Sequence, residues 1–353
     1  MKKVLAVLAI LVVLGAAGVA GFFWWRDQQI TRFAQAPFGE PGAKLVDIPP
    51  GTGPKLLGLL LERHGVVSNA EQFYAYVRRE KSAPRLKAGE YEFAGPLTPA
   101  QVVEKIASGQ VKQYHFTVPE GLRMDEILPI LAGSELKLNL DKLQKLAEDK
   151  SFARKAGVPA GAHNLEGFLY PDTYSFTHGA NEEAVLSKMV ARTLEEYKKA
   201  DAQRKAGVNL DLLQAVTLGS IVEKETGAPE ERPRIACVFH NRLRLNMKLQ
   251  TDPTVLYAMM LIRGSFIKNI TSQDLTTPHP YNTYTTPGLP PGPIANPGAA
   301  ALQAALNPID CNDLFFVSKN NGTHVFCPDL KCHNAQVEKW QREYFRKQKH
   351  TSK

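Results

Sequence analysis

The chain has 353 residues, of which 44% are hydrophobic and 22% are charged, and its formal net charge at pH 7 is +8. This balance is typical of a packed globular protein and excludes an intrinsically disordered chain. The length allows one large domain or two ordinary ones.

An uninterrupted apolar run extends from Val4 to Trp25 and follows Lys2 and Lys3. As a helix that rises about 1.5 Å per residue, it is long enough to cross a hydrocarbon core of about 30 Å. A cleaved signal peptide is the alternative, but the aromatic residues at 22–25 fit an interfacial belt better. We therefore predict a single-pass membrane anchor, with residues 1–3 as a cytoplasmic tail and everything after residue 26 exported.

The positive charge of an exported protein indicates an anionic partner. Nucleic acid is a poor candidate there, whereas lipid headgroups and the carboxylates of a cell-wall polymer are better ones. Part of the charge lies in residues 346–353, which we interpret as a solvated basic tail. The sequence has no phosphate-binding loop, dinucleotide fingerprint or Ser-His-Asp pattern, so no cofactor is predicted.

Four cysteines are present, at positions 237, 311, 327 and 332. In an oxidising compartment we expect one disulfide among Cys311, Cys327 and Cys332, which are close in sequence. We expect Cys237, in an apparently buried helix, to be a free and inert thiol. The segment HVFCPDLKCH at 324–333 could supply zinc ligands, but its spacing matches no common zinc pattern, so no metal site is predicted.

Three further regions follow the apolar run. Residues 26–43 are rich in proline and glycine and are predicted to form a flexible linker with a reach of about 20 to 25 Å. Residues 44–112 combine short strands, a Pro-Gly turn and amphipathic helices, which indicates a small α+β module. One of its helices should be capped by Thr98 and end at Gly109.

Residues 113–345 are predicted to form a mixed α+β domain, with 113–155 as a connecting subdomain. We expect an apolar helix at 210–226 and a hairpin at 314–327 with an Asn-Asn-Gly turn. Residues 278–297 contain seven prolines and are expected to be a surface wall or a binding loop. The predicted fold class is therefore α+β, with a transmembrane helix, a small module and a larger mixed domain.

The segment LGSIVEKETG at 218–227 places two glutamates at the end of the apolar helix. Glu223 and Glu225 are about 200° apart around the helix axis, so they cannot face the same cleft. Glu223 shares its side with Gly219 and Thr226, which leave room for a ligand, whereas Glu225 is expected to form a salt bridge with an arginine. By spacing alone, Glu223 is more often a structural ion pair than a desolvated, protonated general acid.

A set of motifs resembles the endolytic murein transglycosylase family (YceG-like, or MltG): LEGFLYPDTY, SIVEKET, VFHNRL, LQTDPTVLYAM and YNTYTTPGLPPGPIANPG, in this order. The similarity covers nearly the whole exported part, including a small module similar to the family's LysM-like domain. The resemblance implies that Glu223 is the catalytic acid. The implied reaction is cleavage of the β-1,4 bond between N-acetylmuramic acid and N-acetylglucosamine in peptidoglycan glycan strands, which leaves a 1,6-anhydro end.

The resemblance also implies a place in the cell. It indicates a bacterial inner-membrane protein with a periplasmic catalytic domain, which ends the elongation of nascent glycan strands close to the bilayer. It further implies partnership with peptidoglycan synthases, for which the residues themselves give no sign. The alternative function is a non-catalytic, membrane-anchored scaffold that binds peptidoglycan and in which Glu223 is only a structural ion pair.

One carboxyl can suffice for the implied chemistry. Glu223 would protonate the departing oxygen, and the acetamido group or the C6 hydroxyl of the sugar would capture the oxocarbenium-like centre, with the same glutamate acting as base. A hydrolase would need a second carboxyl about 5 to 10 Å away. Glu166 and Asp252 are the candidates, but Glu166 is equally well explained by structural hydrogen bonds and Asp252 by a helix cap.

Several side chains have the amide, hydroxyl and aromatic groups that grip sugars. The predicted substrate-binding residues are Gln250, Thr251, Asn282, Thr283, Tyr284 and Glu166. Sugar contact and wall-building are equally good interpretations of these residues. We expect Arg242 to pair with the apolar helix and His240 to be a helix histidine with a satisfied hydrogen bond.

Overall fold

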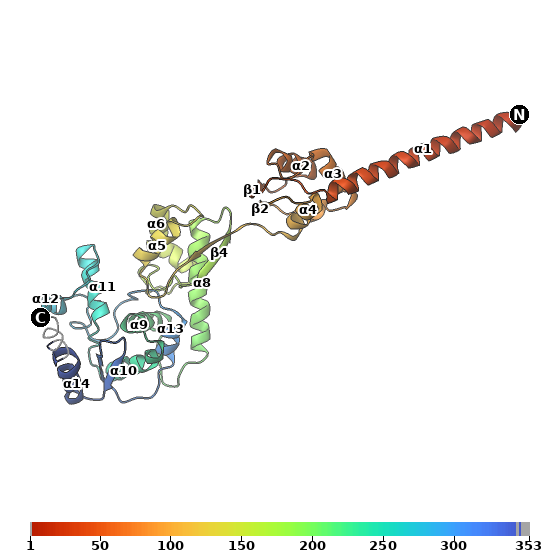
Figure 1. Ribbon diagram of the computed structural model, residues 1–353. Coiled ribbons are helices and arrows are strands. Elements are labelled where there is room, and N and C mark those ends of the chain that lie inside the picture. Colours follow the sequence, from red (N-terminus) through yellow and green to blue (C-terminus); the bar gives the residue numbers. More distant parts are fainter. Residues whose placement is uncertain (1, 344–345, 347–353) are drawn as a thin grey trace. The chain divides into compact units, whose positions relative to one another are not determined.

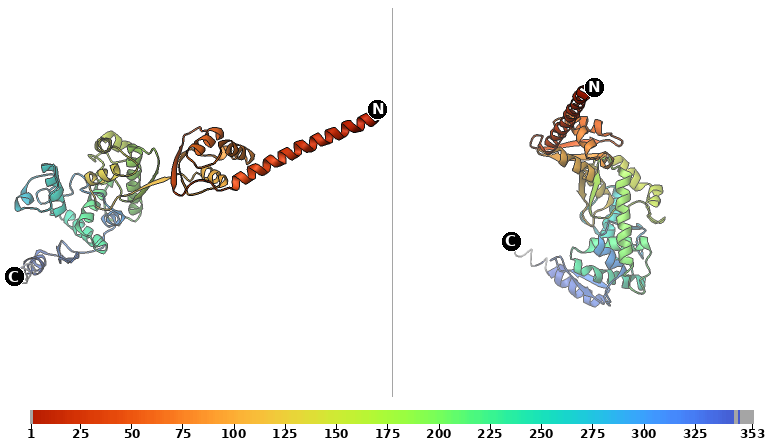
Figure 2. Two further views of the ribbon diagram at one scale, coloured as in Figure 1. Left: turned by 45° about the horizontal axis from the view of Figure 1, so that its top comes forward. Right: turned by 90° about the vertical axis from the view of Figure 1, so that its right-hand side faces the viewer.

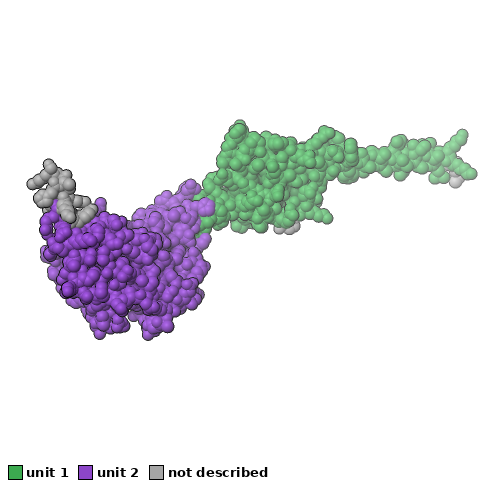
Figure 3. All heavy atoms as spheres, turned by 60° about the horizontal axis from the view of Figure 1, so that its bottom comes forward, with its two compact units in different colours: residues 1–114, 175–179 green, residues 115–174, 180–353 purple. Residues whose placement is uncertain are grey.

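The computed structural model describes residues 2–343 and 346, so nearly all of the predicted basic tail at 346–353 lies outside the described residues (Figure 1). The chain divides into two compact units (Figure 3). The first comprises Met1–Tyr114 and Ser175–Gly179, and the second His115–Tyr174 and Ala180–Lys353. Each unit is described by itself below.

The apolar run forms part of one continuous helix, α1 (Lys2–Gln35), as Figures 1 and 2 show. The helix has a mean hydropathy of 2.7 in its most apolar window, and it is long and apolar enough to cross a membrane. At about 1.5 Å per residue its 34 residues extend about 50 Å, well beyond a hydrocarbon core of about 30 Å. Part of α1 therefore projects past the apolar run.

The projecting part of α1 corrects the prediction of a flexible linker. Residues 26–35 are helical, and Phe33 and Ala34 are buried. Phe33 belongs to the same core cluster as Leu57, Phe73 and Tyr91 of the first unit. The burial of this apolar pair favours helix over coil, so the anchor runs into the first unit without a hinge at residue 26.

After α1, the first unit has the element order β-α-α-β-α. Its elements are β1 (Ala43–Ile48), α2 (Pro54–Arg63), α3 (Ala70–Arg79), a short 3-10 helix (Ala83–Arg85), β2 (Gly89–Ala94) and α4 (Pro99–Ser108). β1 and β2 are antiparallel, with Ala43 opposite Ala94 and Ile48 opposite Gly89. The predicted cap of α4 is confirmed, because Thr98 accepts a hydrogen bond from the Gln101 amide and Gly109 follows with a φ of 75°.

β3 (Gln113–Thr117) pairs with β4 (Thr173–Thr177) in a two-stranded sheet, and the division into units falls within these strands. The second unit is mainly helical. Its helices are α5 (Met124–Ala132), α6 (Leu140–Glu148), α7 (Lys150–Lys155), α8 (Glu182–Asp201), α9 (Leu212–Glu225), a 3-10 turn (Pro229–Glu231), α10 (Arg232–Arg244), α11 (Asp252–Arg263), α12 (Ser272–Thr276), α13 (Ala299–Leu306), α14 (Leu330–Val337) and a π-helical turn (Glu338–Glu343). The predicted hairpin is present as β5 (Phe315–Ser318) and β6 (His324–Cys327).

The apolar helix α9 is the centre of the second unit. A capping box starts it, because Asp211 accepts from the Gln214 amide and Gln214 accepts from the Asp211 amide. Every residue from 215 to 222 is buried. α9 packs against α13, and a Cβ added to Gly219 would lie 3.2 Å from the Leu302 side chain. The small residue at 219 therefore serves the close approach of two helices.

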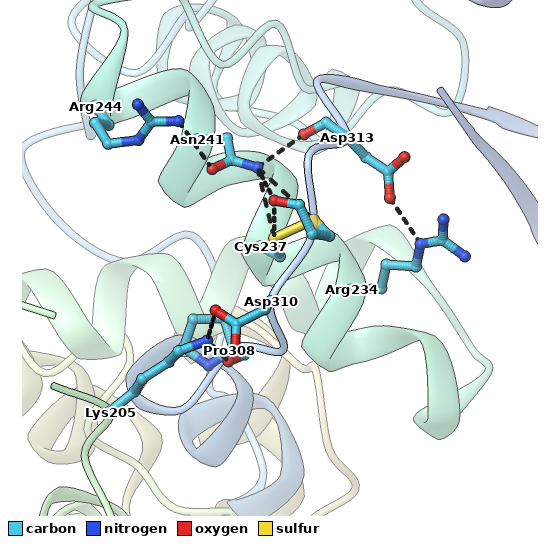
Figure 4. Close-up of a disulfide and its surroundings, with 9 residues drawn as sticks. Lys205, Arg234, Cys237, Asn241, Arg244, Pro308, Asp310 and Asp313 are labelled. Atoms are coloured by element: carbon cyan, nitrogen blue, oxygen red, sulfur yellow. Dashed lines mark hydrogen bonds and ion pairs between the residues drawn. A yellow bond between two sulfur atoms is a disulfide. The ribbon is translucent and has the colours of Figure 1, made fainter. Parts of the chain in front are cut away.

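Two disulfides join the four cysteines, Cys237 to Cys311 and Cys327 to Cys332. The expectation of one bridge among the three C-terminal cysteines is confirmed, and the expectation that Cys237 is a free thiol is wrong. Figure 4 shows the reason: Asn241, one turn after Cys237 on α10, donates hydrogen bonds to the Cys311 carbonyl at 3.0 Å and the Asp313 carbonyl at 3.1 Å. These bonds hold residues 311–313 against α10. Cys311 therefore lies next to Cys237 in space, although the two are 74 residues apart in sequence.

Candidate active site

Glu223 is enclosed by protein at the end of α9. Its carboxylate accepts hydrogen bonds from the Arg232 guanidinium at 2.6 Å and from the Gly298 amide at 3.0 Å. The Glu223 and Arg232 side chains are only 5% and 9% exposed. Burial raises the pKa of Glu223, while the Gly298 amide and Arg232 oppose that rise. Glu223 and Arg232 therefore form a buried ion pair.

The space expected beside Glu223 is occupied. A Cβ on Gly121 would lie 3.4 Å from the Glu223 Cγ, and Lys224 donates to the Gly121 carbonyl at 2.9 Å. One turn earlier on α9, residues of α13 occupy the space beside Gly219. The expectation that small residues leave room for a ligand at Glu223 is therefore not met, because the backbone around Gly121 and helix α13 fill that room.

Glu225 has different neighbours. It is half-buried, and its carboxylate accepts a short hydrogen bond from the Thr251 hydroxyl. Burial raises the pKa of Glu225 to about 7; the Thr251 hydrogen bond lowers it, the charge of Asp252 raises it further, and Arg242 lowers it. Within the described part of the chain no arginine forms an ion pair with Glu225, so the predicted salt bridge is wrong.

Glu225 lines a groove with a volume of about 510 Å³, which we call the Glu225 groove. One side is formed by the end of α9, the start of α11 and Tyr284, and the other by the β5–β6 hairpin and α14. The lining residues are Glu225, Arg242, Leu249, Gln250, Asp252, Tyr284, Phe315, Phe316, Val317, Ser318, His324, Leu330, His333, Val337 and Gln341. Aromatic faces, two amides, hydroxyls and two carboxyls together are a surface suited to a saccharide.

Two of the predicted substrate-binding residues reach this groove. Gln250 is exposed and has a φ of 51°, a left-handed backbone conformation that is uncommon for a residue with a side chain. Such conformations cluster at functional sites. Tyr284 donates a hydrogen bond to the Asp252 carboxylate at 2.7 Å. Asp252 is the first residue of α11 and is exposed in the groove, with Thr251 in the capping position.

Three other predicted residues are buried and build the wall. Thr251 holds Glu225, and its amide donates to the Thr283 hydroxyl at 3.1 Å. Asn282 donates to the carbonyls of Asp274 at 3.0 Å and Thr277 at 2.8 Å. These contacts leave Thr251, Thr283 and Asn282 as supports that fix the loop carrying Tyr284.

Glu166 does not line the Glu225 groove. It is buried, and its carboxylate accepts hydrogen bonds from the Met124 amide and the Asn296 side chain, each at 3.0 Å, and from the Tyr257 hydroxyl at 3.3 Å. Burial raises the pKa of Glu166 to about 8. The contacts agree with the structural interpretation of this residue and give no sign of a sugar contact.

Arg242 donates hydrogen bonds to backbone carbonyls and forms no ion pair with α9 within the described residues. It donates to the carbonyls of Leu314 at 2.6 Å and Leu249 at 2.9 Å, and thereby joins the two sides of the groove. His240 makes the expected satisfying contact, with its Nε2 2.8 Å from the Ala305 carbonyl. Arg242 therefore supports the groove that it lines, and His240 joins α10 to α13.

The sequence reasoning missed the hairpin wall. Ser318 and His324 line the groove, and the His324 Nδ1 lies 2.7 Å from the Glu231 carboxylate. In the sequence, His324 and His333 stand out only as candidate zinc ligands, and the two cysteines of that segment are joined to each other. The available signal was the alternation in HVFC, where His324 and Phe326 share one face of a strand and Val325 and Cys327 share the other.

Comparison with known proteins identifies the family of this chain. The sequence profile of the YceG-like family matches residues 46–339. A protein named endolytic murein transglycosylase from Bacillus subtilis (strain 168) is 33% identical over 312 residues, which cover 84% of each chain. A protein of the same name from Streptococcus pneumoniae (strain D39) is 28% identical over 83% of this chain, which spans 57% of that protein.

A solved structure is also similar. The crystal structure of a YceG-like protein from Listeria monocytogenes aligns with a TM-score of 0.57 at 32% identity, over 83% of this chain and 98% of that one. The fold and these matches define a protein of the YceG-like class. The chain belongs to the YceG-like family.

Proposed function

We propose that this protein is an endolytic murein transglycosylase and that Glu225 is its general acid. The name of its relatives supports the activity. The position of Glu225 supports the assignment: it is a partly exposed carboxyl that lines a groove, with a pKa raised to about 7. A carboxyl with such a pKa is protonated in a useful fraction near neutral pH and can donate that proton to a glycosidic oxygen.

The proposed reaction uses Glu225 twice. Its proton goes to the oxygen between N-acetylmuramic acid and N-acetylglucosamine as the bond from that oxygen to the muramyl C1 breaks. The muramyl C6 hydroxyl then bonds to C1 and returns its proton to Glu225, which leaves a 1,6-anhydro end and consumes no water. Thr251 donates to the carboxylate form of Glu225 and so steadies it between the two proton transfers.

A hydrolase is the competing chemistry, because Asp252 is a second carboxyl in the same groove. Its Oδ1 accepts the hydrogen bond from Tyr284, which holds it against the wall. A hydrolase would use such a carboxyl to activate water or to attack C1. The products separate the two reactions, since a transglycosylase leaves anhydro ends and a hydrolase leaves reducing ends.

The experiment is digestion of purified sacculi by the full-length protein in detergent, with the products analysed by mass spectrometry. We expect internal cuts with anhydro-muramyl ends for the wild type and none for Glu225→Gln. Glu223→Gln is the matched control, because it removes the same charge two residues away. Binding of sacculi without release of fragments by the wild type would support the non-catalytic scaffold instead.

We also propose that α1 anchors the protein in a bacterial inner membrane, with the Glu225 groove in the periplasm. Its length and apolarity support a membrane span. The first unit is proposed to be LysM-like on the basis of its β-α-α-β order. Cleavage near the bilayer would then end the elongation of nascent strands, and peptidoglycan synthases would be natural partners. Cell fractionation with protease accessibility on spheroplasts tests the orientation.

A further inference from the structure

A second hollow lies in the first unit, where α1 meets α2 and α3. It has a volume of about 660 Å³ and is lined by residues of all three helices. Among them are Phe23, Arg26, Lys55, Leu59, Arg78 and Arg79. We call it the juxtamembrane groove. It has no role in the chemistry proposed for the Glu225 groove.

The groove begins at the end of the apolar run of α1. Phe23 lies within that run, and Arg26 is the first charged residue after it. Because α1 is one continuous helix, the depth at which Phe23 and Arg26 lie in the membrane also sets the position of the groove along the membrane normal. If α1 spans a bilayer as proposed, Phe23, Trp24 and Trp25 lie at the level where aromatic residues gather, the headgroup layer. The groove therefore opens into that layer.

The charges around the groove favour an anion. Four basic residues line it, against two acidic ones, Asp27 and Glu71. Asp27 forms an ion pair with Arg79, with 3.2 Å between the carboxylate oxygen and the guanidinium nitrogen. Arg26, Lys55 and Arg78 are exposed, and none of them has an ion-pair partner within residues 2–343. The Arg78 guanidinium lies over the Tyr74 ring at 5.8 Å, which orients it without neutralising its charge.

Exposed leucines lie beside these charges. Leu59, which lines the groove, is 47% exposed, and Leu56, three residues before it on the same face of α2, is 59% exposed. Lys55 precedes them on the same helix. Exposed leucines beside unpaired cations match a phospholipid, which has a charged headgroup and acyl chains, better than they match a free anion.

We propose that the juxtamembrane groove binds the headgroup of an anionic phospholipid from the membrane that holds α1. Its negative charge lies among Arg26, Lys55 and Arg78, and the upper carbons of its acyl chains contact Leu56 and Leu59. This inference rests on the proposed membrane anchor and is independent of glycan cleavage. The bound lipid would hold the first unit against the bilayer.

The test uses the full-length protein in nanodiscs of phosphatidylcholine with a minor share of phosphatidylglycerol. Native mass spectrometry of the ejected protein measures the ratio of the two lipids that remain bound. We expect phosphatidylglycerol to be enriched over its share in the nanodisc. Lys55→Glu with Arg78→Glu should reduce that enrichment by about fivefold or more, and adding inorganic phosphate should not displace the lipid.

The matched control is Lys145→Glu with Lys150→Glu, which changes the net charge equally at two exposed lysines of the second unit. It should keep the enrichment. If circular dichroism shows that the first double variant unfolds, Lys55→Gln with Arg78→Gln serves in its place. Wild-type protein that stays in the nanodisc without enrichment overturns the proposal, as does displacement by phosphate or equal loss in the control. Protein that leaves the nanodisc overturns the membrane anchor and this inference together.

Discussion

Glu223 and Arg232 form an ion pair of 2.6 Å in which both side chains are almost completely buried. The pair joins the end of α9 to the start of α10. The Gly298 amide, in the segment before α13, donates a hydrogen bond to the same Glu223 carboxylate. Two residues later the helix has turned by about 200°, and Glu225 faces the groove. One helix end thus supplies a carboxylate that holds three segments together and another that is available to a ligand.

The first prediction separates the two glutamates. Glu225→Gln should lower transglycosylase activity by about a hundredfold or more, because the amide has no proton to give to the leaving oxygen. Its fold should be intact, since glutamine can still accept the Thr251 hydrogen bond. Sacculus digestion with mass spectrometry measures the activity, and circular dichroism measures the fold.

Glu223→Gln should behave in the opposite way. It removes the closer counter-charge of the buried Arg232 guanidinium and leaves only the half-exposed Glu120 carboxylate at 3.6 Å, which costs about 3 kcal/mol of folding free energy. Activity per folded molecule should stay close to that of the wild type. A fully folded but inactive Glu223→Gln, beside an active Glu225→Gln, would return the role of acid to Glu223.

The second prediction concerns Thr251, a positioning residue. Its hydroxyl stabilises the carboxylate form of Glu225 and thereby lowers the pKa of that group. Thr251→Val keeps the volume and removes the donor. The pKa of Glu225 should rise, so the decline of kcat/KM toward alkaline pH should move upward by about one pH unit.

The pH profile distinguishes this role from a purely structural one. Thr254→Val, a neighbouring substitution that removes the hydroxyl bonded to the Thr251 carbonyl at 2.7 Å, should cost stability without moving the decline. If both variants share the wild-type profile and differ only in rate, the Thr251 hydroxyl does not set the protonation of Glu225.

The third prediction links Glu225 to stability. Burial raises its pKa in the folded protein to about 7, above the ordinary value of 4.5. The folded state therefore holds this proton more tightly than the unfolded state, so the contribution of Glu225 to stability is full below about pH 4.5 and is lost as pH rises through about 7.

Glu225→Gln removes that dependence. At pH 8 the variant should be more stable than the wild type by on the order of 2 kcal/mol, a figure reduced for the partial exposure of the side chain. At pH 5 the two should unfold at nearly equal denaturant concentrations. Urea titrations at the two pH values, monitored by tryptophan fluorescence, measure the difference. A difference that is constant with pH would mean that Glu225 has an ordinary pKa.

Local signals predicted many of the elements. Thr98 with Pro99 and Gly109 marks both ends of α4, and the Asn-Asn-Gly turn marks the β5–β6 hairpin, because each motif satisfies its own backbone groups within a few residues. The family motifs likewise indicated the class of protein and the helix that carries the proposed acid. These features depend on residues that are neighbours in the chain.

The errors concern contacts between distant segments. A glycine at position 219 leaves space for either a sugar or a neighbouring helix, and the sequence does not distinguish the two. The position of α13 shows that the space is used by a helix. Asn282 and Thr283 have sugar-binding chemistry, but their hydrogen bonds are used by α11 and α12 and the loops beside them. Phe33 gave no sign that it belongs to a core whose other members begin at Val46.

The last prediction compares the two disulfides, which close loops of very different length. Cys237 and Cys311 are 74 residues apart, and Cys327 and Cys332 are five apart. A cross-link restricts the unfolded chain more when its loop is longer, which gives about 4 kcal/mol for the first bridge and about 2 kcal/mol for the second. The first loop also contains α11 and α13, whereas the second only joins β6 to α14. Urea titrations of Cys237→Ala with Cys311→Ala and of Cys327→Ala with Cys332→Ala should therefore show the larger loss in the first pair. An equal loss would mean that the Asn241 hydrogen bonds to the Cys311 and Asp313 carbonyls, which both pairs retain, already hold this segment on α10 without the covalent bond.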